Sequence, residues 1–130
     1  MSYMSKHKSS LENRHYITDA FVQTHWYNFY ETKLRGFIDS YVYEFCLVIN
    51  GSADFDDAYI LPFKDFKDFF SPDFLDGHHR WVGNVRDYDE VVELSAGGRK
   101  KERFAHEYHN AFHLLQDGPP LPEDQQEHYV

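Results

Sequence analysis

Two carboxylates and one lysine lie within a short, aromatic part of the chain, at Asp19, Glu31 and Lys33. If residues 19–33 form a β-hairpin with a loop of about three residues, Asp19 pairs with Glu31 across the two strands. Lys33 follows Glu31 by two positions and therefore projects from the same face. Such a group can hold a hard divalent cation on its carboxylates, while the lysine orients an attacking water or a phosphate oxygen.

The same residues also fit one continuous helix, with Thr18 as its N-cap. Asp19 and Glu31 would then lie about 18 Å apart along the helix axis, at about 1.5 Å per residue, and could not share an ion. The aromatic run at 26–30 favours the hairpin, because aromatic residues are enriched in strands. Both alternatives are left open. The apolar stripe of the helical alternative consists of Val22, Trp26, Phe29, Tyr30, Lys33 and Phe37.

The remaining pattern predicts an α/β (α+β) fold, a single small domain with a central mixed β-sheet flanked by helices. The apolar run at 41–49 is the strongest predicted strand and is expected to be central in its sheet. The domain is expected over residues 14–115, after a polar tail with a short helix at 1–13 and before a flexible, acidic, proline-containing tail at 116–130. Other predicted elements are strands at 58–61, 79–85 and 90–94, a helix at 63–70 with four phenylalanines on one face, and a last helix from about residue 99 to 115.

Composition limits the class of protein. Hydrophobic residues make up 42% and aromatic residues 18% of the chain, too many for a disordered protein. The single cysteine, Cys46, lies in an apolar run and is expected to be buried and inert. The sequence shows no signal peptide and no apolar run of about 18 residues, so we expect a soluble cytoplasmic protein without a membrane partner.

The formal net charge is -9, and the segment 54–93 carries eleven acids against four bases. This charge repels phosphate backbones, so any DNA binding must come from a local basic surface, a bound metal or a partner subunit. An acidic surface also suits a non-catalytic inhibitor or immunity-type protein that binds a basic nuclease or nucleic-acid-binding partner. The basic candidates are Arg99, Lys100, Lys101 and Arg103 in one patch, and Lys6, Lys8 and Arg14 in another.

Histidines offer a second candidate metal site. On the predicted last helix, His106, His109 and His113 fall within about 60° of one another. Histidines three and four residues apart can share a metal ion, with His78 and His79 as possible further ligands. The same histidines also fit a solvated, histidine-rich helix face.

The pattern of Asp19 followed by Glu31-x-Lys33 resembles the active-site signature of the PD-(D/E)xK, or restriction-endonuclease-like, nucleases. Thr18 stands where that family has a proline. The resemblance implies a restriction-endonuclease-like fold and metal-dependent hydrolysis of DNA, by a homodimer or with a protein partner, in a prokaryotic defence or DNA-processing system. It further implies Asp19 and Glu31 as ligands of Mg²⁺ or Mn²⁺, Lys33 as the catalytic lysine, and Glu12 as an accessory acid.

Overall fold

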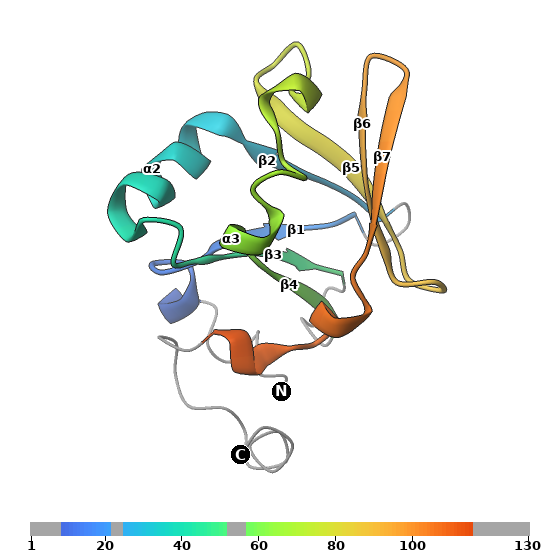
Figure 1. The fold of residues 1–130 in the computed structure, drawn as a ribbon. Coiled ribbons are helices and arrows are strands. Elements are labelled where there is room, and N and C mark those ends of the chain that lie inside the picture. Colours follow the sequence, from blue (N-terminus) through green and yellow to red (C-terminus); the bar gives the residue numbers. More distant parts are fainter. Residues whose placement is uncertain (1–8, 22–24, 52–56, 116–130) are drawn as a thin grey trace.

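The computed structural model describes residues 9–21, 25–51 and 57–115, and the two predicted tails lie mostly outside these ranges. The fold is mixed α+β, as predicted, but it has two sheets and not one central sheet (Figure 1). We call β1-β3-β4 sheet A and β2-β5-β6-β7 sheet B. The strands are β1 (Tyr16–Asp19), β2 (Trp26–Tyr30), β3 (Cys46–Asn50), β4 (Ala58–Pro62), β5 (Arg80–Arg86), β6 (Val91–Ala96) and β7 (Arg99–Phe104).

Sheet A is mixed, with β3 in its centre, as the apolar run predicted. The strand covers residues 46–50 and not 41–49, because α2 extends to Tyr41 and the positive φ values of Val42 and Tyr43 do not fit a strand. β3 runs parallel to β1 and antiparallel to β4. All five residues of β3 are buried, because both faces of the sheet are covered. Leu47 and Ile49 belong to the main core, whereas Cys46 and Val48 pack against a second cluster with Leu11, Phe112 and Leu115.

Sheet B is antiparallel throughout. Its middle pair, β5 and β6, confirms the two short strands predicted at 79–85 and 90–94, with bounds shifted by one or two residues. In β5, buried and half-buried residues alternate, so one face of the sheet packs on the core.

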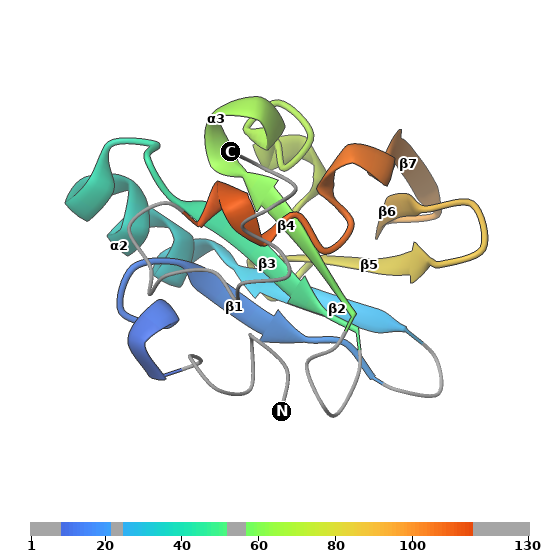
Figure 2. The same cartoon turned by 90° about the horizontal axis from the view of Figure 1, so that it is seen from below.

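The helices are short and lie beside the sheets (Figures 1 and 2). α2 (Glu31–Tyr41) follows β2 without a loop, and α3 (Phe63–Phe66) follows β4. The predicted helix at 63–70 is thus only four residues long, but its four phenylalanines are all buried as expected. The 3-10 helices are η1 (Pro72–Phe74), η2 (His106–Tyr108) and η3 (Phe112–Leu114), and residues 9–11 form one further helical turn.

The predicted hairpin over residues 19–33 is wrong, and so is the continuous helix. β1 pairs with β3, and β2 pairs with β5, so Asp19 does not pair with Glu31. The apolar strand β3 pairs with β1 on one side and with β4 on the other. β2 pairs with β5 and therefore belongs to sheet B. The chain then changes from strand to helix between Tyr30 and Glu31.

The predicted last helix is also wrong. Gly97 and Gly98 have φ values of 55° and 78°, which suit the tight turn of a β-hairpin. This turn joins β6 to β7, so residues 99–104 are a strand, and 3-10 helices follow it. None of the helices in the described ranges is both long enough and apolar enough to span a bilayer.

Candidate functional site

Asp19 and Glu12, two of the predicted metal-binding acids, lie at opposite ends of β1. Asp19 ends the strand, where its Oδ1 accepts a hydrogen bond of 3.2 Å from the side-chain amide of Asn50. Glu12 is exposed in the turn before the strand begins at Tyr16. Since β1 alone spans about 10 Å at 3.3 Å per residue, the two acids are too far apart for one ion.

Glu31 and Lys33 lie in the first turn of α2 and not on a strand. The Glu31 carboxylate is 3.7 Å from Nδ1 of His79. The Lys33 Nζ lies 4.8 Å from the centre of the Tyr16 ring, which is at the start of β1. Asp19 is at the far end of that strand, about 10 Å along it. The three predicted catalytic residues therefore make separate contacts.

Two of the three histidines predicted as an alternative metal site, His106 and His109, contact carboxylates. Glu90 contacts Nδ1 of His106 and lies 3.6 Å from Nδ1 of His109, whose Nε2 contacts Asp57. His113 belongs to η3, where burial lowers its pKa. Within the described ranges, no three metal-ligating side chains are grouped so as to hold an ion.

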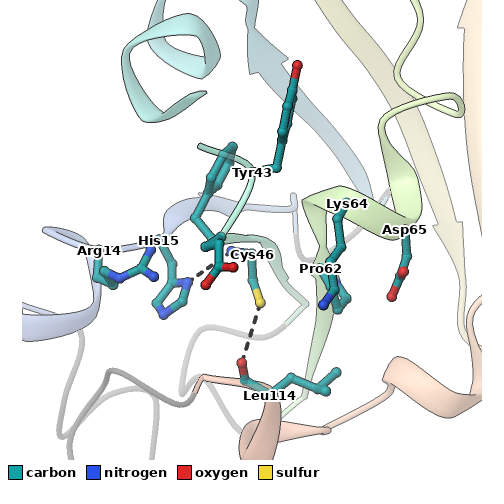
Figure 3. A pocket seen from close by; sticks show the side chains of 10 residues that line it. Arg14, His15, Tyr43, Cys46, Pro62, Lys64, Asp65 and Leu114 are labelled. Carbon is teal, nitrogen blue, oxygen red and sulfur yellow. Dashed lines mark hydrogen bonds between the residues drawn. The ribbon is translucent and has the colours of Figure 1, made fainter. Parts of the chain in front are cut away.

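A pocket with a volume of about 320 Å³ opens at the start of β3 (Figure 3). We call it the thiol pocket, because Cys46 lines it. His15 Nδ1 accepts a hydrogen bond of 2.9 Å from the backbone N–H of Cys46. Burial raises the pKa of the Cys46 thiol to about 12, so the thiol stays protonated at neutral pH and is a poor nucleophile. The charged lining is balanced: Arg14 and Lys64 face Glu44 and Asp65.

Most side chains of the predicted basic patch on β7 form hydrogen bonds within the fold. Arg99, Lys101 and Arg103 each donate hydrogen bonds to backbone carbonyls of segment 65–73. Because successive strand residues point to opposite sides, Lys100 projects from the other face of the sheet. Among the described residues, Lys100 has no ion pair.

The face of sheet B that points away from the core carries exposed aromatic side chains. Tyr27 and Phe29 are buried in the core, so Trp26 and Tyr30 project outward and are 39% and 47% exposed. They lie about 13 Å apart at 3.3 Å per residue. Arg80, on the neighbouring strand, lies directly opposite Tyr30. Figure 1 shows α2 and α3 on the opposite side of β5, β6 and β7.

This outer face holds a second pocket, with a volume of about 340 Å³, which we call the sheet-face pocket. The indole of Trp26 lines one part of it, and Val82 and Ser95 lie between β2 and β7 in a cross-strand row that ends at Lys100. An aromatic surface and positive charge therefore meet in one hollow. Two outward-pointing cations, Arg80 and Lys100, line it with one carboxylate, Asp76, whereas the Arg99 side chain turns to Asp73 and Phe74 on the core side.

The cations of the sheet-face pocket differ in how firmly they are held. Arg80 Nε donates a hydrogen bond of 2.7 Å to Asp76, and this bond, with a second to Tyr30, raises the pKa of the guanidinium. The Arg99 guanidinium lies 4.6 Å from the centre of the Phe74 ring. The Arg80 guanidinium is thus oriented in advance and that of Arg99 is held on the core side, whereas the Lys100 ammonium is held by no ion pair within the described ranges.

At the other end of the outer face, around Arg86, the charged side chains form ion pairs with one another. Arg86 lies 2.5 Å from Glu93, 3.0 Å from Asp89 and 3.2 Å from Glu102. One cation is thus surrounded by three carboxylates. Positive charge on the outer face is therefore concentrated at the sheet-face pocket.

The described acids of segment 54–93 are distributed over several parts of the fold. Asp65 lies on α3, Asp76 beside Arg80, and Glu90 in the turn between β5 and β6. Asp54 and Asp56 lie outside the described residues. Within the described ranges, Asp57, Asp87 and Glu90 gather around Tyr59 and His109, whereas Asp65 and Asp76 lie elsewhere.

Comparisons of the chain with family models, with curated proteins and with solved structures give no match. They neither support nor refute the resemblance to PD-(D/E)xK nucleases. The site must therefore be judged from its own residues.

Sequence reasoning did not identify Trp26, Tyr30 and Arg80 as one surface. The alternation of Trp26 and Tyr30 with Tyr27 and Phe29 was the available signal, since it separates the two faces of a strand. The partner strand that supplies Arg80 lies about fifty residues later in the chain, and no local pattern gives that pairing.

Proposed function

We propose that the protein binds nucleic acid, with DNA as the expected partner, across the outer face of sheet B. The observation that supports the proposal is the sheet-face pocket, where an exposed indole and two cations, Arg80 and Lys100, line one hollow. Aromatic side chains stack on bases and cations attract phosphates, and this combination binds strands with little dependence on sequence. The protein would thus be a binding domain.

The net charge of -9 opposes this binding only at long range. At physiological ionic strength the screening length is about 8 Å, so a bound phosphate responds mainly to the charges nearest to it. In the sheet-face pocket these are Arg80, which is paired with Asp76, and Lys100. We expect modest affinity that falls as salt increases, with a small slope, because few phosphates are neutralised.

Hydrolysis of the bound strand with Mg²⁺ stays a prediction from the sequence. It required Asp19, Glu31 and Lys33 at one point, and their contacts in the fold are separate. The binding proposal assigns no role to these residues. The inhibitor or immunity-type function stays a prediction as well.

The proposal is tested by fluorescence anisotropy with a labelled oligonucleotide of about 15 nucleotides, titrated with the folded protein at two salt concentrations. We expect Lys100→Glu to weaken binding by about tenfold or more, since it reverses the charge of the least constrained cation in the pocket. Saturable binding that weakens with salt supports the proposal. No binding by the folded parent overturns it.

Lys67→Glu is the matched control. It changes the net charge by the same amount, but Lys67 lies over the Tyr43 ring, with Nζ 5.5 Å from the ring centre, and does not line the sheet-face pocket. We expect this variant to bind almost as well as the parent. Equal losses in Lys100→Glu and Lys67→Glu would mean that only total charge matters, and the assigned surface would be wrong.

A further inference from the structure

We infer that the sheet-face pocket takes an unpaired nucleotide, with its base stacked on Trp26 and its phosphate next to Arg80 and Lys100, so that single strands bind in preference to duplexes. This inference rests on the proposed function and names the form of nucleic acid that the same surface binds. Trp26 is 39% exposed, which leaves part of its ring open to a ligand.

The width of sheet B excludes the usual way of reading a duplex. Its four strands span about 14 Å between the outer strand axes, at about 4.8 Å per strand spacing. The major groove of B-DNA is about 12 Å wide and admits a helix or a two-stranded ribbon. A four-stranded face therefore rests on the outside of a duplex, where base surfaces are out of reach of Trp26.

The β6–β7 hairpin is narrow enough to enter a groove, but its tip cannot read bases. Gly97 and Gly98 form the turn and have no side chains. The next residue, Arg99, is held back by the carbonyl of Asp73 and by the Phe74 ring. Recognition of a duplex by the hairpin is therefore disfavoured as well.

An unpaired base avoids both constraints, because it can turn its flat face to the indole. The cross-strand row from Asn28 through Val82 and Ser95 to Lys100 lies two positions along the sheet from Trp26, so the pocket extends from the indole on β2 to the ammonium on β7, where a phosphate of the same strand can bind. Arg80, fixed by Asp76, lies at the same pocket. One base and one phosphate of a single strand match this arrangement of one ring and neighbouring cations.

The experiment compares one labelled strand of about 15 nucleotides with the duplex of the same sequence, using the full chain. We expect the single strand to bind at least about tenfold more tightly. Trp26→Leu should weaken single-strand binding by about 5- to 150-fold, the range for loss of one base stack, and leave duplex binding unchanged. Trp26→Phe, which keeps an aromatic ring, should retain most of the affinity.

Tyr43→Leu serves as the matched control, since Tyr43 is 42% exposed and lies beside the thiol pocket. Equal affinity for strand and duplex, or no effect of Trp26→Leu, overturns the inference and leaves the proposed function standing. Competition by a polyglutamate peptide as effective as that by the oligonucleotide also overturns it, because the pocket then recognises charge alone. Absence of binding to either nucleic acid overturns the proposed function itself.

Discussion

The hydroxyl of Tyr27 donates a hydrogen bond of 2.8 Å to the backbone carbonyl of Glu93, a buried contact between residues 66 positions apart. Gly83 lies between them, paired with Tyr27 on one side and with Leu94 on the other. A Cβ at Gly83 would be 1.7 Å from the Glu93 carbonyl oxygen and 2.9 Å from the Tyr27 hydroxyl. The missing side chain therefore lets β2, β5 and β6 close into the sheet that carries the sheet-face pocket.

We expect Gly83→Ala to lower the free energy of unfolding by more than about 3 kcal/mol, because backbone must move to admit the methyl group. Tyr27→Phe should cost about 1–3 kcal/mol, since it leaves the buried Glu93 carbonyl without its donor. Urea unfolding followed by circular dichroism measures both. Gly77→Ala is the control, as its Cβ would meet no atom within 4 Å. Equal stability of Gly83→Ala and Gly77→Ala would refute the assigned packing.

Gly36 lies exposed in the middle of α2, where a Cβ would meet no atom within 4 Å. Alanine favours helix over glycine by about 1 kcal/mol at such a position. We expect Gly36→Ala to raise the free energy of unfolding by about 0.5–1 kcal/mol, measured by urea unfolding. Gly98→Ala should do the opposite, because Gly98 has a φ of 78°, which strains any residue with a Cβ. A loss of stability in Gly36→Ala would contradict the helix at this position.

The parts of the fold that sequence predicted are those set by local pattern. Buried strand β3 and its neighbour β4 followed from continuous apolar runs, and β5 from alternation. The phenylalanines of segment 63–70 were correctly assigned to the core although the helix is shorter. In these segments, the residue types within a few positions of each other predict which side chains are buried, so the local sequence pattern is sufficient to predict the element.

The parts that sequence missed depend on long-range pairing. β1 and β2 are neighbours in the chain but join different sheets, because each finds a partner much later in the sequence. Gly97 and Gly98 fit equally a helix start and a hairpin turn, and only the pairing of β6 with β7 decides between them. The candidate site on sheet B was missed for the same reason, since Trp26 and Lys100 line one pocket only because β2, β5, β6 and β7 pair in that order.

Val42 follows α2 in the left-handed region, with φ 48° and ψ 56°. A β-branched residue is strained there, by about 1–2 kcal/mol relative to residues that adopt this conformation easily. Val42 is also 70% exposed, so few contacts compensate the strain. We expect Val42→Asn and Val42→Gly to raise the free energy of unfolding by about 1 kcal/mol in thermal or urea unfolding. A decrease in both variants would mean that the exposed Val42 side chain stabilises the fold in some other way.

Glu31 and Lys33 provide a test of the predicted metal site that is independent of binding. Since neither residue lines the sheet-face pocket, we expect Glu31→Gln and Lys33→Met to bind a labelled single strand as the parent does. Plasmid nicking with and without Mg²⁺ is measured in parallel on the same preparations. Metal-dependent nicking by the parent that both variants lose would restore these residues as a catalytic group, despite their separate contacts.

The buried thiol of Cys46 makes stability depend on alkaline pH. Burial raises its pKa from the ordinary value of 9.0 to about 12 in the folded protein. The unfolded chain therefore loses this proton first as pH rises. The stability that the protonated thiol contributes is fully present below about pH 9 and is lost as pH rises toward 12. Four tyrosines also have raised pKa values, from an ordinary value of 10.0, so their effect on stability begins at higher pH; they are Tyr16, Tyr27, Tyr59 and Tyr108.

We expect Cys46→Ala to reduce the loss of stability between about pH 8 and pH 10, measured by urea unfolding. Parallel losses in parent and variant over this interval would show that the thiol ionises as readily in the folded protein as in the unfolded chain.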